Sequence, residues 1–144
     1  MIRRRSTLTL LPFLAALAAC AASTPAPTLV DGELTGQRVV SSSGAEEITL
    51  RTIPQPIPLN EPFELVVGVF DAESGAPCPE AEVFVRAWMP DHGHGMFRQP
   101  EVVPAGSGTF EVKGLLFHMG GRWEFSVDIV RGGLASSATV EVHL

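Results

Sequence analysis

The sequence predicts an all-β fold, an immunoglobulin-like β-sandwich of about seven antiparallel strands. From Glu46 onward apolar and polar residues alternate almost without interruption, which is the pattern of half-buried strands. Glycine, proline and asparagine interrupt this alternation at intervals of about ten residues, as they do between the short strands of a sandwich. No helical period is visible after residue 20, so we expect two packed sheets around one core.

The first three strands are expected at residues 46–53, 62–71 and 82–88. A proline-rich turn separates the first two, and alternate apolar residues from Phe63 to Val69 share one face of the second strand. The loop 72–81 leads to the third strand. Each of these connections reverses the chain, as antiparallel neighbours require.

The last four strands are expected at residues 98–103, 109–117, 122–130 and from the Gly132-Gly133 turn to Leu144. The alternation is clearest in 122–130, where Trp123 and Phe125 share one face and Glu124 and Ser126 the other. A tight turn over 105–108 joins the fourth and fifth strands. Packing is expected to rest on Trp123, Phe125, Phe63, Phe110 and the aliphatic faces.

The N-terminus has the form of an export signal. Three consecutive arginines precede an apolar run from Leu8 to Ala19, which is too short to span a bilayer as a helix. The run ends Leu17-Ala18-Ala19-Cys20, which resembles the lipobox of bacterial lipoproteins. That resemblance implies cleavage before Cys20 and acylation of its thiol. The alternative is an ordinary signal peptide cut near Ala22, and in both cases the mature chain is exported.

These patterns divide the chain into a lipoprotein signal peptide at 1–19, a lipidated flexible tether at 20–45 and a folded domain at 46–144. The tether is predicted from its content of alanine, serine, threonine, proline and glycine. Within it, Leu29-Val30 and Val39-Val40 can pair locally as a strand.

The net charge and the cysteine content exclude one class of partner and one kind of cross-link. Without the three N-terminal arginines, seven basic residues remain against 16 acidic ones, a net charge of −9. Such a surface repels nucleic acid and anionic lipid headgroups, so we expect no nucleic-acid partner. Cys78 is the one thiol left once Cys20 is acylated or removed, so no disulfide within the chain is expected.

Residues Met89 to Met96, hereafter the octet, read Met-Pro-Asp-His-Gly-His-Gly-Met. Apart from the initiator, all methionines and three of the four histidines lie between Met89 and Met119. Thioethers and imidazoles together favour copper over hard cations, which prefer oxygen ligands. A site for Cu(I), Cu(II) or both is therefore expected. The expected ligands are Met89, His92, His94, Met96, His118 and Met119.

The other residues of the octet are compatible with a copper site but also have structural explanations. Gly93 and Gly95 allow the chain to turn both imidazoles to one side, and Asp91 can orient an imidazole from behind the ligands. Zinc is disfavoured because its sites do not rely on methionine. Each residue taken alone also has a structural interpretation, as part of a glycine-rich turn or as a core methionine.

Strand counting predicts which segments meet, because loops of an antiparallel sandwich alternate between its two ends. The octet follows the third strand and His118-Met119 follows the fifth, so both lie at the same end. Cys78 falls at the opposite end and is a poor ligand candidate. His143 can reach the octet's end, although a histidine there is more often only solvated. Trp88 is expected in the core or as a lid over the site.

The order Met-Pro-x-His-Gly-His-Gly-Met, then a hairpin with Gly-Thr-Phe, then Phe-His-Met-Gly-Gly-Arg-Trp-Glu-Phe resembles the YtkA-like domain family of exported bacterial proteins. The resemblance covers about Ile48 to Leu144 and implies an immunoglobulin-like sandwich at the cell envelope. The chain is also distantly similar to periplasmic copper chaperones with histidine and methionine ligands and to CopC-like copper-resistance proteins. Their ligands have other spacings, so this likeness suggests copper only by analogy.

Together these observations predict an exported lipoprotein that binds copper for delivery, storage or resistance. Its partners would be the membrane, through the lipid on Cys20, and a copper-receiving envelope protein. Because Ala21 rather than Asp follows Cys20, a Gram-negative cell would place it on the periplasmic side of the outer membrane. No nucleophile elbow, phosphate-binding loop or carboxylate pair is visible, so no enzyme is expected. The alternative is an envelope protein-interaction module that binds no metal.

Overall fold

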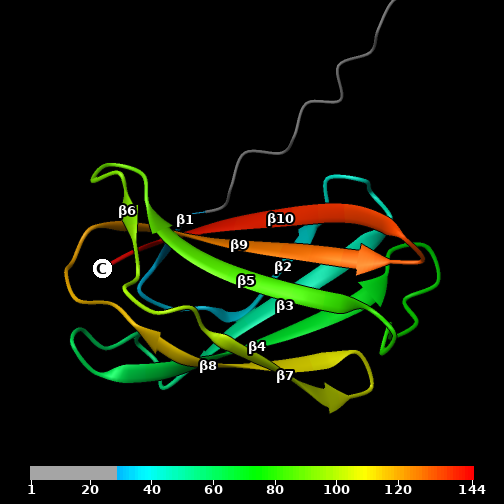
Figure 1. Cartoon of the computed structure of the whole chain (residues 1–144), viewed down its shortest axis with the longest axis horizontal. Coiled ribbons are helices and arrows are strands. Elements are labelled where there is room, and N and C mark those ends of the chain that lie inside the picture. The colour runs from blue at the N-terminus through cyan, green and yellow to red at the C-terminus, as the bar shows by residue number, and fades with distance from the viewer. Residues whose placement is uncertain (1–28) are drawn as a thin grey trace, which may run out of the picture.

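The computed structural model describes residues 29–144, which form two stacked five-stranded sheets (Figure 1). Strand order is β1-β10-β9-β5-β6 in one sheet and β2-β3-β4-β8-β7 in the other. The strands are β1 (Leu29–Asp31), β2 (Thr35–Val40), β3 (Glu46–Ile53), β4 (Pro62–Asp71), β5 (Glu82–Met89), β6 (His94–Gly95), β7 (Glu101–Gly106), β8 (Thr109–Leu116), β9 (Arg122–Arg131) and β10 (Leu134–His143).

The predicted fold class is confirmed. All seven expected strands are present as β3, β4, β5, β7, β8, β9 and β10, and neighbours among them pair antiparallel. The match is close because one face of each strand is buried, which fixes a period of two in the sequence. The strand expected at 98–103 instead begins at Glu101 and includes Pro104, because β7 lies at a sheet edge where a missing N–H is tolerated.

The prediction of a flexible tether over 20–45 is wrong for residues 29–45, the part of that segment that the structure describes. Residues 29–31 form β1, which pairs parallel with the end of β10, and residues 35–40 form β2, which pairs with β3. The two segments therefore do not pair locally with each other. Between them Leu34 is fully buried and anchors the connection to the core. The signal peptide and Cys20 lie outside the described residues.

The core fills the space between the sheets and is built by strict alternation. In β5 the odd-numbered residues Val83, Val85 and Met89 face inward, and even-numbered residues face outward. The predicted aromatic core is confirmed, because Trp123, Phe125, Phe63 and Phe110 are all buried. Burial of this apolar surface is the main driving force for folding the sandwich.

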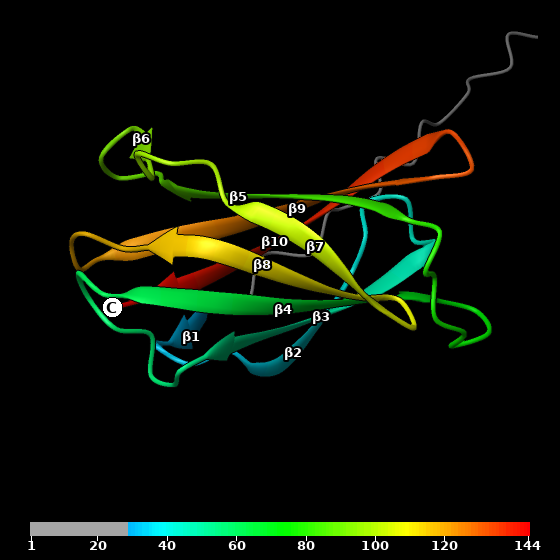
Figure 2. The ribbon, with the colours of Figure 1, turned by 60° about the horizontal axis from the view of Figure 1, so that its bottom comes forward.

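Loops alternate between the two ends of the sandwich, as strand counting requires. The octet, the β8–β9 turn and the C-terminus lie at one end, whereas the β4–β5 loop and the β9–β10 turn lie at the other (Figures 1 and 2). A bridge between Leu59 and Phe117 brings the β3–β4 connection to the octet's end as well. Within residues 29–144 no helix is long and apolar enough to span a membrane.

Candidate metal centre

The octet and the turn that contains His118 meet at one end of the sandwich. The imidazole rings of His94 and His118 are stacked with centroids 5.4 Å apart, and those of His92 and His94 are 5.8 Å apart. The octet begins at the last residue of β5 and contains β6, both in one sheet, and His118 follows β8 in the other, so this contact joins the two sheets. The predicted meeting of the two segments is confirmed.

The octet reverses the chain through a short hydrogen-bonded turn. The carbonyl oxygen of Met89 accepts hydrogen bonds from the N–H groups of His92 at 3.2 Å and Gly93 at 3.0 Å. Gly93 has φ of +68°, a backbone conformation that residues with side chains rarely adopt. His94 then pairs with Met89 in the register of β6 on β5. The turn therefore returns the second histidine alongside the strand that precedes the octet.

Glycine is required at position 95 because β6 approaches β5 closely there. A Cβ atom at Gly95 would lie 2.7 Å from the carbonyl oxygen of Ala87 and 3.3 Å from the Trp88 ring. Only glycine fits there without moving β6 away from β5. The two glycines of the octet thus allow the backbone on either side of His94 to follow this path.

His118 is half-buried in an aromatic surround. Its ring centroid lies 5.0 Å from that of Phe97 and 5.7 Å from that of Trp123, the latter edge to face. Its Nδ1 is buried and has no hydrogen-bond partner among the described residues. A buried polar atom without a partner is costly. A neutral imidazole nitrogen is also a common metal ligand, so an ion at this position would satisfy it.

The other two histidines are more accessible. His94 is half-buried, and its Nδ1 lies 3.3 Å from the carbonyl oxygen of Gly95. A proton on Nδ1 would make that contact a hydrogen bond and leave Nε2 free to bind a metal. His92 is exposed at the outer bend of the octet. His92 is therefore the exposed member of the set, whereas His94 and His118 are both half-buried and His118 has a buried Nδ1.

The three methionines differ in burial. Met89 is fully buried, and its terminal methyl carbon lies 3.3 Å from the position that a Cβ on Gly121 would occupy. Met96 and Met119 are half-buried and pack against the core. The backbone carbonyl of Met119 also accepts a 3.0 Å hydrogen bond from the indole N–H of Trp123. Met89 therefore packs beneath the turn, whereas the other two lie where the core meets the surface.

An arginine fixes the octet to the sheet. The guanidinium of Arg122 donates to both carboxylate oxygens of Asp91, at 3.1 and 2.7 Å, and to Glu141 at 3.0 Å. The hydrogen bonds from Arg122 hold the pKa of Asp91 below its ordinary value. Among the described residues the Asp91 side chain accepts hydrogen bonds from Arg122 and from no imidazole, so the expected orientation of an imidazole by Asp91 is not found. Arg122 belongs to the Met-Gly-Gly-Arg-Trp motif, but only the fold reveals its partners.

The separations of the imidazole rings are compatible with an ion shared between neighbouring histidines. An ion about 2.0 Å from two imidazole nitrogens keeps the ring centroids within about 6.4 Å, and both observed separations fall inside that limit. Within the described residues, no three histidine, cysteine, aspartate or glutamate side chains are already gathered as a metal site. Methionine sulfur would therefore have to complete the ligand set, which is chemistry that suits copper.

The remaining residues singled out in the sequence lie around or away from this centre. Trp88 points outward and is 46% exposed, so it is not a core residue. His143 is exposed on β10 opposite Arg122. Cys78 is buried at the far end of the sandwich, where Arg131 donates to its sulfur at 2.8 Å. The prediction that Cys78 lies away from the octet is confirmed.

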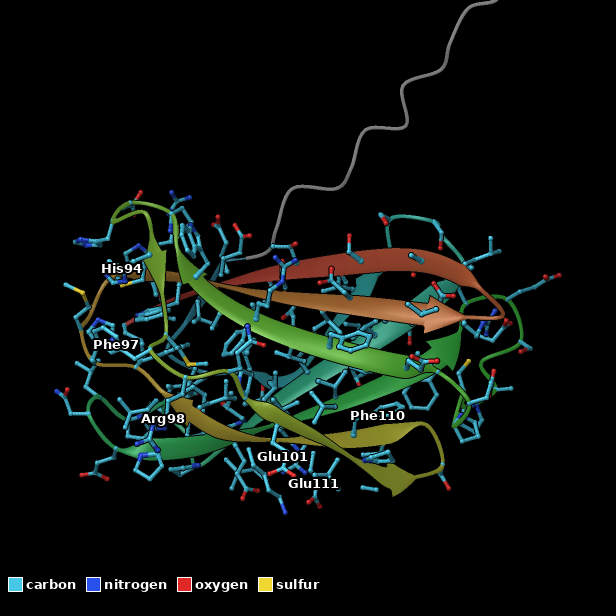
Figure 3. The ribbon with its side chains drawn as sticks, in the orientation of Figure 1. His94, Phe97, Arg98, Glu101, Phe110 and Glu111 are labelled. Atoms are coloured by element: carbon cyan, nitrogen blue, oxygen red, sulfur yellow. The ribbon has the colours of Figure 1, made fainter. Side chains whose placement is uncertain are left out.

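A groove of about 700 Å³ runs beside the centre, between the outer face of β5 and the segment that leaves β6. Trp88, Met96 and Phe97 line it together with Arg86 and Arg98. Phe97 is 90% exposed and lies at the same end of the molecule as His94 (Figure 3). The alternating pattern did not indicate Phe97, because it lies in an irregular segment after β6.

Comparison with known proteins gives a family and a fold. The family model described as YtkA-like matches residues 42–128. A solved structure of a copper-bound variant of FetP from uropathogenic Escherichia coli strain F11 superposes with a TM-score of 0.51 at 12% sequence identity. The alignment covers 76% of this chain and 90% of that one. No curated protein matches the sequence.

Proposed function

The chain belongs to the YtkA-like family, and on that premise we propose that it is an exported lipoprotein that binds copper. The observation that carries the proposal is the succession of three imidazole rings that ends at the unpartnered, buried Nδ1 of His118. The proposed ligands are Met89, His92, His94, Met96, His118 and Met119.

The choice of copper is supported by two independent lines. The donor atoms are imidazole nitrogen and thioether sulfur, a combination that suits Cu(I) and tolerates Cu(II). A structure with the same fold, that of the FetP variant, is copper-bound. Its sequence identity of 12% means that ligands cannot be transferred from it residue by residue. The ligand set proposed here therefore comes from this chain alone.

We infer a direction of loading from the exposure of His92 and the buried Nδ1 of His118. His92 lies at the surface and would meet an incoming ion first, and His94 lies between it and His118. His118, whose Nδ1 is buried and whose ring contacts Phe97 and Trp123, would then hold the ion. In this scheme copper is cargo rather than a catalytic group. Delivery, storage and resistance all use such a site, and we propose no catalysis.

We further propose that Cys20 is acylated and that the protein is held at the cell envelope, where a copper-receiving protein is its partner. Without Asp at position 21, a Gram-negative cell would place it on the periplasmic face of the outer membrane. Labelling cells with a radioactive or clickable fatty acid tests the anchor. Label should enter the wild-type protein and be absent from Cys20→Ser. Equal labelling of both proteins would refute the anchor.

The copper proposal is tested with residues 24–144, which contain every strand of the two sheets. Cu(I) and Cu(II) are titrated against a competing chelator for the wild type, His92→Ala/His94→Ala and His143→Ala. His143 is a matched control, because it is an exposed histidine at the same end but outside the octet. Tight binding that the double variant loses and the control keeps supports the proposal. Micromolar or weaker binding that is unchanged in the double variant would refute it.

One observation favours a second function, an envelope module that binds another protein and no metal. The groove beside the octet exposes Trp88 and Phe97, and exposed aromatic side chains are common at protein interfaces. A partner seated there would cover Met96 as well. Wild-type protein that binds no copper, yet loses a cellular cross-linked partner in Trp88→Ala, would favour this function over the first.

A further inference from the structure

One border of the first sheet is open along most of a strand. β6 pairs only with the last two residues of β5, as Gly95 with Trp88 and His94 with Met89. From Glu82 to Ala87 the strand is therefore paired on one side only, with β9. Figures 1 and 2 show β5 along this border, with β6 placed only at its end. Such an edge presents unpaired backbone N–H and C=O groups to solvent.

The other sheet borders in the described part of the chain carry features that discourage further pairing. β7 contains Pro104 and a shift of register next to it. β2 has a shift of register between Thr35 and Gln37, and β1 is three residues long. β5 has none of these features, and its register with β9 runs unbroken from Glu82 to Trp88. Natural edges are usually protected by such devices, and along the border of β5 only the charged side chains of Glu82 and Arg86 serve that role, so this edge is the one best suited to accept a further strand.

The backbone direction of β5 identifies which residues can pair. The Met89 carbonyl bonds to the octet, and the Ala87 carbonyl approaches Gly95, so odd-numbered residues direct their backbone groups to the open border. By alternation Val83 and Val85 do the same, while Phe84 bonds toward β9. A new antiparallel strand would therefore form its hydrogen bonds with Val83 and Val85.

The sequence of this border is complementary to itself. Residues 82–86 read Glu-Val-Phe-Val-Arg, with Glu82, Phe84 and Arg86 on the outer face. If a second copy runs antiparallel with Phe84 opposite Phe84, each Glu82 stands opposite an Arg86 and each Val83 opposite a Val85. A register centred on Glu82 or Arg86 would instead oppose like charges, which is destabilising. Among registers centred on an outward-facing residue from Glu82 to Arg86, charge thus favours the one centred on Phe84, and it is also the one that pairs each Glu82 with an Arg86.

We propose that two copies of this chain associate through β5, joining their first sheets into one continuous sheet across a two-fold axis at Phe84. Phe84 is 54% exposed in the single chain, and pairing would cover both rings. The exposed ion pairs add little affinity on their own, so their role is to set the register. The Arg86–Asp128 pair at 2.9 Å already holds each Arg86 side chain on the outer face. This association does not depend on copper binding, because no proposed ligand lies in residues 82–86.

Sedimentation of residues 24–144 from micromolar to millimolar concentration tests the proposal. The wild type should show a monomer–dimer equilibrium, and Phe84→Lys should raise the dissociation constant at least tenfold. Arg86→Glu should weaken the dimer, and Glu82→Arg/Arg86→Glu should restore it. Asp128→Ala is the matched control, because it removes the same internal ion pair and leaves the border intact. A chain that stays monomeric at millimolar concentration overturns the proposal.

Amide hydrogen exchange locates the interface. Protection at Val83 and Val85 should rise with protein concentration, whereas the amide of Phe84, directed to β9, should not change. A dimer that is unaffected by both Phe84→Lys and Arg86→Glu, or whose protected amides lie outside 82–86, overturns the assignment of β5.

Discussion

His94 and His118 hold their imidazole rings stacked 5.4 Å apart across the junction of the two sheets. His94 belongs to β6 of the first sheet, and His118 follows β8 of the second. An ion bound to both rings would therefore connect the sheets at this end of the sandwich. Binding to the folded chain alone would add to its free energy of unfolding.

The first prediction concerns copper and stability. At a free Cu(I) concentration about 100 times the dissociation constant, the free energy of unfolding should rise by about 2.7 kcal/mol. His118→Ala should lose this gain, and His143→Ala should keep it. Urea denaturation followed by tryptophan fluorescence measures both, because Trp123 lies 5.7 Å from the His118 ring. Full copper stabilisation in His118→Ala would contradict the ligand assignment.

The second prediction distinguishes the structural role of Met89 from the metal-binding role of Met96. Met89 is fully buried, so Met89→Ala should lower the free energy of unfolding by about 2–5 kcal/mol in metal-free protein. Met96 is half-buried at the groove, so Met96→Ala should cost less and act mainly on Cu(I) affinity. Chemical denaturation and chelator competition on the same two variants provide the comparison. The assignment fails if Met96→Ala leaves Cu(I) affinity unchanged.

The third prediction concerns the anchor of the octet. Removing the carboxylate in Asp91→Ala frees the turn from Arg122, so the amides of His92 and Gly93 should exchange faster. Asp128→Ala breaks an exposed ion pair in the same sheet and should leave those amides unchanged. Hydrogen exchange by NMR reports both. Unchanged exchange in Asp91→Ala would show that the turn is held by its own backbone bonds.

The fourth prediction concerns acid. Hydrogen bonds from the backbone and side chain of Ser74, and then from Arg131, hold the pKa of Asp71 well below its ordinary value. A carboxylate with a lowered pKa in the folded state stabilises the fold above its ordinary pKa of 3.8, and this contribution is lost as the pH falls further. Asp71→Asn should therefore be less stable at neutral pH, with a flatter decline below pH 4. Denaturant midpoints of the wild type and Asp71→Asn, measured from neutral pH to below pH 4, test this difference in stability. Parallel stability curves for the two proteins would contradict the prediction.

The sequence predicts the strands from Glu46 onward because each has one buried face, and the alternation of Trp123 and Phe125 with polar residues records this directly. It does not predict the partners of β1 and β2. The apolar pairs Leu29-Val30 and Val39-Val40 indicate only a local pairing, whereas β2 pairs with β3 and β1 with the C-terminal β10. Such a partner, over a hundred residues away, leaves no local pattern.

The candidate site shows the same division. Counting strands is enough to bring His94 and His118 together, because loop positions follow from topology. The engagement of Asp91 by Arg122 and the contact of Phe97 with His118 depend on side-chain directions in an irregular loop, which no period encodes. The sequence therefore predicts the candidate metal ligands better than it predicts the residues that position them.

The pairing of the C-terminal residue with the β8–β9 turn has a practical consequence. Leu144 and Gly121 exchange backbone hydrogen bonds of 2.9 and 3.1 Å, so Leu144 lies beside the turn that contains His118 and Met119. A polyhistidine purification tag added after Leu144 would begin beside the proposed ligands and offer them competing imidazoles. Affinities measured on such a fusion would report the tag together with the protein. Metal titrations therefore require protein from which the tag has been removed.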